Sequence, residues 1–584
     1  MKTKYFVAAV AGALLALTSC VKDLETLPLN DWDVTSETAY GTDRTAYIQG
    51  LAKIYFNFTS NDTTDLLVSD AGASELIRAF WSCQEVSTDE VKCAWGDAWA
   101  EAINRNMYDD SENDMVYGVF VRTLQGISYV NEYLRQTTSG KLEERGVDSY
   151  LANDIAGFRA EARFLRAYFY WMAMDIFGDV PFTTEDSPFG AVNPKQKSRK
   201  EVYEFIVSEL EALAADDSAM PAAQSNRPRA DKGSVLGLLA RVYLNAEVYC
   251  GTPAYDKAKQ TCEKIFTLGY MLCPEYEPLF RGDNGENPQA YNEFLFSAYY
   301  DENNAKSWGG GTFLTCAAIN SNETLADTDI EYQVKDENGN PKVDADGNPV
   351  MATKKISRLG VGGGWLGLHI HEHFVNTHFA PTDVVFNAEG DGSYTIADKR
   401  GANIFVTSRR EKGDFSELQN TFTQGWGCWK YNNIPHDESG LAFWERTGSP
   451  DKQTNIDYPL IRLGEIYLIY AESCVRLGQD IALAQTKMNE LAERTGVAPI
   501  SLPGAWDDAA MKLFREERGR ELLWEGHRRT DLIRYKSYCE GTYVWPFKGG
   551  SVAGQEFPKY KELFAIPVSQ LLANPELHNP EGYN

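Results

Sequence analysis

Apolar residues recur at alternating steps of three and four through residues 154–177. The recurring positions are Ile155, Phe158, Ala162, Leu165, Phe169, Met172 and Ile176. This spacing places them on one face of an α-helix. Tyr168 and Trp171 add a second apolar face, so we expect a helix that is buried on most sides. Gly178 and Pro181, in "FGDVPF", end it.

Two pairs of helices follow the same pattern. In the first pair apolar positions line residues 235–246 and 258–266, with "CGTP" between them. In the second pair they line residues 466–477 and 481–491, on either side of Gly478. Each pair is similar to a tetratricopeptide unit, although the strict signature of that repeat is degenerate. The pattern therefore predicts a helical frame.

Residues 271–454 differ from the flanking helical regions, because they are rich in Gly, Asn, Asp and aromatic residues and have few helical runs. We interpret this segment as an inserted, loop-rich domain. Within it "DENGNPKVDADGNP", residues 336–349, repeats the pattern Asp-x-x-Gly-Asn-Pro. Turn residues that flank a β-prone pair predict an exposed hairpin. A weak Ca²⁺ loop is the alternative, but the Glu at position 12 and the flanking helices of an EF-hand are not evident.

The N-terminal segment has the pattern of an export signal. Two lysines precede an apolar run, residues 6–17, that is too short for a permanent membrane helix. The run leads into "LTSC", which resembles a bacterial lipobox. We expect a signal peptide over 1–19, a lipid on Cys20 and a tether over 20–40; an ordinary secretory peptide is the alternative. The acidic "CVKDLE" resembles the signal that sends some Bacteroidetes lipoproteins to the cell surface.

Composition narrows the classes of function. Apolar residues make up 43% and charged residues 24% of the 584-residue chain, which is enough to bury a large core. The formal net charge of −28 disfavours binding to the phosphate backbone of nucleic acids. Nine cysteines remain after Cys20, without a Cys-x-x-Cys motif, so zinc-ribbon and thioredoxin-like sites are disfavoured and buried free thiols are expected.

Five segments, in this order, resemble the SusD/RagB family. They are "RAEARFLRAYFYWMAMDIFGDVPF", "NRPRADKGSVLGLLARVYLNAEVY", "YPLIRLGEIYLIYAESCVRLG", "REERGRELLWEGHRRTDLIRY" and the ending "FAIPVSQLLANPELHNPEGY". The resemblance implies a mostly α-helical fold, with helical regions over 41–270 and 455–584 around the insertion over 271–454. It also implies a non-catalytic, surface-exposed outer-membrane lipoprotein, without a cofactor, that binds glycans. Its partner would be a TonB-dependent transporter of the SusC type.

One charged segment has two interpretations. In "EERGRELLWEGHRRTDLIR", Glu517, Glu521 and Glu525 are four residues apart among arginines. Such spacing stabilises a helix. Paired carboxylates also occur in glycosidases, which hold two acids about 5–10 Å apart across a sugar. Two residues on one helix meet that distance trivially, so we favour the structural interpretation.

The resemblance also suggests where a glycan binds, because sugars stack on exposed aromatic rings and bond to polar groups beside them. In "ELIRAFWSCQEVSTDEVKCAWGD", Trp95 matches a glucan-contacting Trp of the starch-binding branch, with Arg78 upstream as a partner for hydroxyl groups. In "FLFSAYYDENNAKSWGGGTFL", Tyr299 matches best and Tyr300 is the alternative. Lys306 could bind hydroxyl groups there.

A third segment, "GGGWLGLHIHEHFVNTHF", places Trp365 at the position of a platform Trp. Where the branch has an Arg, this chain has histidines, either His369 or His371, and the predicted hairpin lies just before Trp365. These departures leave the linkage specificity open. Each ring has core packing as its alternative, and Trp99 and Trp308 are further candidates.

The histidines in this segment raise the question of a metal site. A zincin requires His-Glu-x-x-His, and Val375 breaks that motif. His-x-His can bind a metal, but needs further ligands, and no supporting cluster stands out. We therefore expect no metal, with His371 either bonding to sugar hydroxyl groups or packing. The predicted function is capture of a glycan, with a starch-type α-glucan first; another glycan or a peptide, or a glycoside hydrolase, are the alternatives.

Overall fold

The computed structural model describes most of the chain after residue 38. The described residues are 39–61, 71–108, 112–188, 193–319, 328–334, 336, 340–356, 359–361, 363–386, 392–406, 411, 421–436, 453–540 and 543–583. The expected signal peptide and Cys20 lie outside them. Among the described helices, none combines the length and the apolar character needed to cross a bilayer.

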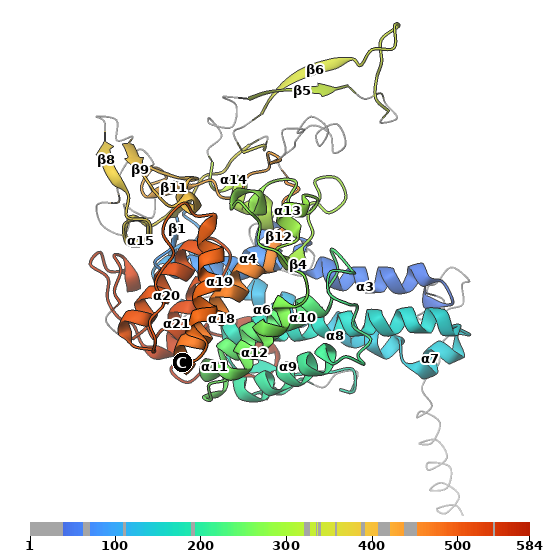
Figure 1. Cartoon of the computed structure of the whole chain (residues 1–584). Coiled ribbons are helices and arrows are strands. Elements are labelled where there is room, and N and C mark those ends of the chain that lie inside the picture. The colour runs from blue at the N-terminus through green and yellow to red at the C-terminus, as the bar shows by residue number, and fades with distance from the viewer. Residues whose placement is uncertain are drawn as a thin grey trace, which may run out of the picture.

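Three helix pairs stack side by side to form the frame (Figure 1). They are α8 (Ser149–Phe177) with α9 (Arg199–Ala214), α10 (Lys232–Leu244) with α12 (Tyr255–Phe266), and α18 (Leu463–Leu477) with α19 (Ile481–Glu493). The α9 helix packs on α10, and α12 packs on α18. The long buried helix and both predicted pairs are confirmed. The sequence analysis missed that the long helix forms a pair of its own with α9.

The core lies where further helices cover α8. The α3 helix (Arg44–Thr59) and α6 (Asp114–Gln136) pack on α8, and α4 (Leu76–Glu85) packs on α6. Aromatic rings join the layers, since Phe58 stacks on Phe169 with ring centroids 4.6 Å apart. Phe296 of β4 (Phe294–Ala298) contacts the same cluster. The β4 strand pairs with β12 (Tyr458–Arg462), so the expected insertion begins inside the core.

A small antiparallel sheet joins distant parts of the chain. Its strand order is β1 (Val91–Cys93), β7 (Leu368–Ile370), β11 (Trp426–Cys428) and β10 (Ile404–Val406). Lys92 lies opposite His369 in the register. This pairing brings the segment after β1 next to the segment before β7, although more than 250 residues separate them. The sequence analysis did not predict these three-residue strands.

The predicted exposed hairpin is confirmed. Strands β5 (Thr328–Gln333) and β6 (Met351–Ile356) pair along their full length and project from the body (Figure 1). Near its tip the two aspartates of the repeated pattern make the same hydrogen bond. The Asp336 and Asp344 carboxylates accept hydrogen bonds of 2.9 Å from the backbone N–H groups of Asn340 and Asn348. These carboxylates close turns, and the Ca²⁺ alternative remains untested.

One further helix, α20 (Asp508–Glu521), has 14 residues. The remaining elements are short. They are η1 (Ala71–Ser74), α5 (Ala98–Asn104), α7 (Ser139–Glu144), β2 (Val180–Pro181), β3 (Gln196–Lys197), α11 (Ala246–Cys250), η2 (Glu277–Phe280), α13 (Pro288–Tyr291), α14 (Gly310–Cys316), α15 (Glu372–His378), β8 (Thr382–Phe386), β9 (Gly392–Thr395), η3 (Lys399–Gly401), α21 (Arg528–Arg534), η4 (Lys548–Gly550), η5 (Lys559–Glu562) and α22 (Val568–Ala573).

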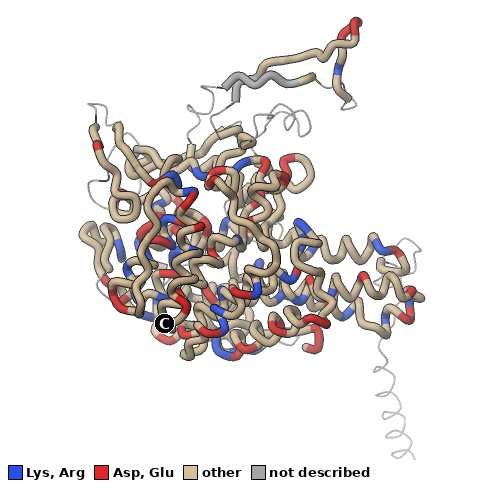
Figure 2. Tube along the Cα trace, in the orientation of Figure 1, with Lys and Arg blue, Asp and Glu red and all other residues tan. Residues whose placement is uncertain are grey.

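A buried ionic network surrounds the end of α20. Glu521 forms ion pairs with Arg462 at 2.7 Å, with Arg494 at 2.6 Å and with Arg400 at 3.1 Å. Burial alone would raise the pKa of Glu521, but the three arginines lower it, so the carboxylate stays ionised. Glu525 adds a further ion pair to Arg462 at 2.7 Å. Along the trace of this part of the chain, Lys and Arg positions lie close to Asp and Glu positions (Figure 2).

The prediction that this charged segment is structural is confirmed. Local pairing on the helix occurs between Glu517 and Arg520, at 2.7 Å, whereas Glu521 and Glu525 pair with Arg462. The α20 helix ends at Glu521, so Glu525 does not share its helix. The partners come from distant segments instead. Arg528 pairs with Asp89 at 2.7 Å, and Arg529 pairs with Asp175 at 3.1 Å. The segment therefore ties the C-terminal region to α4 and α8.

Removing one member of the network should destabilise the fold strongly. We expect Glu521→Gln to lower the free energy of unfolding by about 3–5 kcal/mol, because three arginines would lose a buried counter-charge. Unfolding in urea, followed by tryptophan fluorescence, measures this change. Glu204 is the matched control, since its 4.0 Å pair with Lys200 is exposed; Glu204→Gln should change the free energy of unfolding by at most about 1 kcal/mol. Equal effects of the two substitutions would contradict this role of the network.

Candidate functional site

Trp95 and Trp365, predicted from distant segments, lie in one region of the structure. Trp95 follows β1 and Trp365 precedes β7, so the pairing of these strands brings them together. The Trp95 indole Nε1 donates a hydrogen bond of 2.6 Å to the Leu366 carbonyl oxygen. Gly367 has a φ of +121°, and a Cβ atom there would lie 2.2 Å from that nitrogen. Only glycine permits this approach.

Trp308 joins this cluster from the loop before α14. Its ring lies 5.9 Å from the Trp365 ring, and the two planes are tilted by 47°. The Trp308 backbone N–H donates a 3.0 Å hydrogen bond to the Asn61 side chain. Trp95, Trp308 and Trp365 are each partly exposed. We call these three residues the tryptophan cluster.

Arg78 supports the tryptophan cluster from inside the protein. Only 2% of its surface is exposed. Its guanidinium carbon lies 5.7 Å from the Trp95 ring centre and 4.5 Å from that of Phe313. A Cβ atom at Gly72 would lie 2.0 Å from Arg78 Nη1 and 3.1 Å from Trp308, so Arg78 and Trp308 meet at this glycine. This conformation of Arg78 fixes rings and does not present the guanidinium to a ligand.

Glu75 lies beneath Arg78. Its carboxylate accepts hydrogen bonds from the Arg78 backbone N–H and from the Tyr300 hydroxyl group. Burial raises the pKa of Glu75 to about 7, although these hydrogen bonds act in the opposite direction. Tyr300 is 2% exposed, so it serves as an internal partner of Glu75 and offers no ring to the surface.

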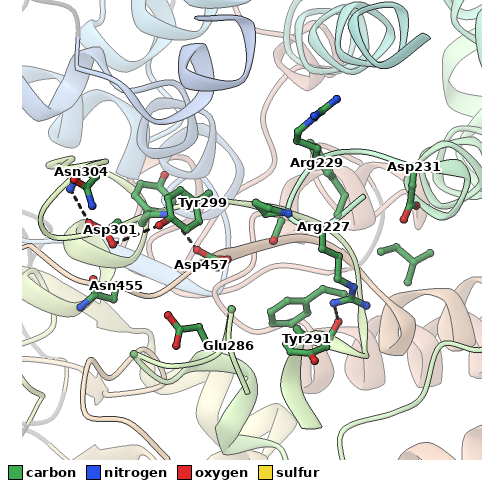
Figure 3. A pocket seen from close by; sticks show the side chains of 18 of the residues that line it. Arg227, Arg229, Asp231, Glu286, Tyr291, Tyr299, Asp301, Asn304, Asn455 and Asp457 are labelled. Atoms are coloured by element: carbon green, nitrogen blue, oxygen red, sulfur yellow. Dashed lines mark hydrogen bonds between the residues drawn. The ribbon is translucent and has the colours of Figure 1, made fainter. Parts of the chain in front are cut away.

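Tyr299 points away from this cluster. It is 43% exposed and lines a cavity whose lining includes neither Arg78, Trp95 nor Trp365 (Figure 3). Adjacent residues on an extended chain point to opposite sides, which explains the difference from Tyr300. Lys306 is exposed on the loop that leads to Trp308. Sequence reasoning grouped Tyr299 with the tryptophans, and the structure separates them.

His369 and His371, which raised the question of a metal site, are buried. His369 lies in β7, where burial lowers the pKa of its imidazole to about 3. His371 is buried too, and its Nδ1 lies 3.0 Å from the Glu411 carboxylate. Packing is thus confirmed for His369, whereas a sugar contact of His371 stays a prediction. Among the described residues, no group of three or more His, Cys, Asp or Glu side chains could hold a metal ion.

The sequence analysis gave Trp308 only as a further candidate, and it missed Glu75. The only signal for Trp308 was the glycine run after it, in "SWGGG". Nothing in the local sequence marked Glu75, because its role depends on Tyr300, which is 225 residues away in the chain. Trp99, the other candidate, is buried and packs edge-on against Trp95 at 6.2 Å.

Comparisons with known proteins agree with this fold. A family model described as "SusD family" matches residues 393–583, and one described as "Starch-binding associating with outer membrane" matches residues 67–244. The "Starch-binding protein SusD" of Bacteroides thetaiotaomicron is 29% identical over the full length of both chains.

Two solved structures share the fold. A SusD superfamily protein from Parabacteroides distasonis is 19% identical, with a TM-score of 0.63, and the match covers 94% of this chain and 100% of that one. A structure described as "Laminarin binding SusD-like protein" is 17% identical, with a TM-score of 0.62, and its match covers 93% and 100% of the two chains.

The raised pKa of Glu75 has a measurable consequence. Its folded pKa lies above the unfolded value, so its stabilising contribution is complete below about pH 4.3 and is lost as the pH rises through about 7. Glu75→Gln removes this titration. Between pH 5 and pH 8 we expect the variant to gain about 1–3 kcal/mol of unfolding free energy relative to the wild type. Urea unfolding of both proteins at both pH values measures the difference; an unchanged difference would show that Glu75 is ionised at pH 5.

Proposed function

The chain belongs to the SusD/RagB family, and we propose that it is a non-catalytic protein that captures polysaccharide on its tryptophan cluster. The protein then passes the polysaccharide to a partner transporter. The single observation that supports this function best is the gathering of Trp95, Trp308 and Trp365, all partly exposed, around the buried Arg78. Sugar rings carry C–H groups on their faces, and these pack on aromatic rings.

A starch-type α-glucan is the proposed ligand. The ring planes of Trp308 and Trp365 are tilted by 47°. Two tilted rings fit a polysaccharide that curves better than one that forms a flat ribbon. The relative that aligns over the full length is named for starch binding. Lys306, exposed at the rim, could bond to hydroxyl groups. Another glycan remains the alternative ligand, since a structural neighbour of the same fold is named for laminarin, and a peptide is a further alternative.

The proposed grip is weak and reversible. Burying a whole aromatic side chain contributes roughly 1.5–3 kcal/mol. Three partly covered rings with a few hydrogen bonds, less the cost of association, leave on the order of 4–7 kcal/mol. This corresponds to a Kd from roughly millimolar to ten micromolar. Such an affinity suits release to a transporter.

We place the protein at the outer membrane, exposed on the cell surface and anchored by a lipid on Cys20, with a SusC-like TonB-dependent transporter as its partner. The description of the matching family model, which mentions association with the outer membrane, supports this location. The net charge of −28 argues against a nucleic-acid partner.

Retention in polysaccharide gels tests the proposed ligand. The wild-type protein should be retarded in native gels that contain starch or pullulan, and Trp95→Ala/Trp365→Ala should migrate as in a gel without polysaccharide. We expect at least a tenfold loss of affinity, because two of the three stacking rings are removed. Dextran and laminarin gels are run in parallel.

Trp506→Ala is the matched control, since Trp506 is a partly buried tryptophan that stacks on Arg476, outside the tryptophan cluster; it should migrate like the wild type. Unretarded migration of the wild type in starch, pullulan and dextran would exclude an α-glucan as the ligand. Retention of the double variant would place the binding surface elsewhere.

The absence of catalysis is a separate prediction. Incubation of the protein with the retained polysaccharide for a day should release no oligosaccharide, because Glu517, Glu521 and Glu525 are all buried in ion pairs. Chromatography of the soluble sugars measures this. Release that persists in Trp506→Ala and is lost in Trp95→Ala/Trp365→Ala would make the protein a glycoside hydrolase.

A further inference from the structure

A cavity of about 350 Å³ opens beside Tyr299 (Figure 3). Three segments line it: residues 227–231 before α10, residues 282–304 around β4, and residues 455–457 before β12. None of the tryptophan cluster lines it. It is therefore a separate feature, and the capture of polysaccharide proposed above does not use it.

One side of the cavity is acidic. Asp301, Asp457, Asn304 and Asn455 lie together with Tyr299 (Figure 3). Asp457 is only 4% exposed, and it accepts a 3.0 Å hydrogen bond from the Tyr300 backbone N–H. The pKa of Asp457 is raised to about 7, chiefly by burial; the hydrogen bond from Tyr300 lowers it, and the nearby carboxylates of Glu286 and Asp301 raise it.

The opposite side carries two arginines, which the protein holds in place. Arg229 is paired with the buried Glu161, to whose carboxylate its Nε and Nη2 groups donate hydrogen bonds. The guanidinium carbon of Arg227 lies 4.7 Å from the centre of the Tyr291 ring, and Arg227 also donates to the Tyr291 carbonyl oxygen. In Figure 3 both arginines lie on the other side of the cavity from Asp301 and Asp457; Arg227 lies beside Tyr291, and the Arg229 guanidinium points away from the acidic side.

The floor between the two sides is apolar. Phe294 and Phe296 of β4 form it, together with the exposed ring of Tyr299. On the other side of Tyr299 a smaller hollow of about 150 Å³ lies against α3, where Ile48 and Phe56 line it. Tyr299 thus has an apolar neighbourhood on one side and hydrogen-bonding groups on the other.

We propose that this cavity is a second carbohydrate site, which encloses one or two sugar rings at the end of a chain or in a free oligosaccharide. The inference rests on the proposed function in assuming that the cargo is a glycan. A simple anion would meet the carboxylates and a simple cation would meet the arginines. A sugar hydroxyl group both donates and accepts hydrogen bonds, so it matches both sides, while the face of a sugar ring matches the exposed ring of Tyr299.

The size of the cavity sets the length of the ligand. At about 350 Å³ it lies near the lower limit of the roughly 300–1,000 Å³ typical of small-molecule sites. It cannot enclose a polysaccharide, whereas the open tryptophan cluster can hold internal segments of one. The two sites should therefore respond differently to chain length.

Calorimetric titration with maltotriose and with laminaritriose, alongside starch and laminarin gels, tests the second site. We expect Asp457→Asn and Tyr299→Ala to weaken trisaccharide binding at least tenfold and to leave retention in the gels unchanged. Asp457→Asn keeps the shape of the side chain and replaces one of its two carboxyl oxygens with an NH2 donor. Trp95→Ala/Trp365→Ala should show the reverse pattern. Ser569→Ala, on the surface away from both sites, is the control, and thermal unfolding checks that each variant is folded.

The outcomes separate the two proposals. If the wild type is retained in a gel but binds neither trisaccharide, or if both cavity variants bind the trisaccharides like the wild type, the second site is wrong and polysaccharide capture stands. If the wild type binds a trisaccharide that the cavity variants lose, while no gel retains it, the second site stands and capture on the tryptophan cluster is wrong. A crystal structure with the bound trisaccharide should place a sugar ring against Tyr299; density only at Trp365 would also overturn the second site.

Discussion

Charges buried away from water connect the C-terminal segment to almost every other part of the frame. Burying an ion costs several kcal/mol unless counter-charges and hydrogen bonds replace the lost water. Glu521 meets this condition only if three arginines surround its carboxylate. They are Arg462 of β12, Arg494 at the end of α19 and Arg400 of η3. A misplaced strand or helix would leave a charge without compensation. The network thereby penalises incorrect arrangements of the helices, in addition to stabilising the correct one.

The same segment determines where the tryptophan cluster lies. The backbone N–H groups of Trp524 and His527 donate to Glu90 and Glu85, at 2.6 Å and 2.8 Å. Glu85 is the last residue of α4, the helix that carries Arg78, and Glu90 directly precedes β1, the strand that leads to Trp95. The supporting arginine and the first ring are thus anchored on residues more than 400 positions later in the chain. Rings held in this way lose little freedom when a sugar binds, which favours binding.

The parts of the fold that the sequence predicted are those whose physics is local. The spacing of apolar residues predicted α8 and the helix pairs, because each helix buries one face whatever its neighbours are. The Asp-x-x-Gly-Asn-Pro repeat predicted its turns for the same reason. The ion pairs of Glu521 were not predictable, since their partners are distant in sequence. The strands β1 and β7 are too short, at three residues each, to show an alternating pattern.

For the site, the family resemblance led to Trp95 and Trp365, but it could not decide which of Tyr299 and Tyr300 faces outward, nor show that Arg78 is buried.

The β5–β6 hairpin has an evolutionary consequence. Hydrogen bonds between its own aspartates and asparagines stabilise its tip. The tip therefore does not depend on contacts with the core. Length changes in such a self-contained arm carry only a small entropic cost. Because the arm lies between α14 and β7, which flank Trp365, natural variation there can reshape the surroundings of Trp365 while leaving the frame intact. Divergence in cargo among related chains can begin at this position, before any residue of the core has to change.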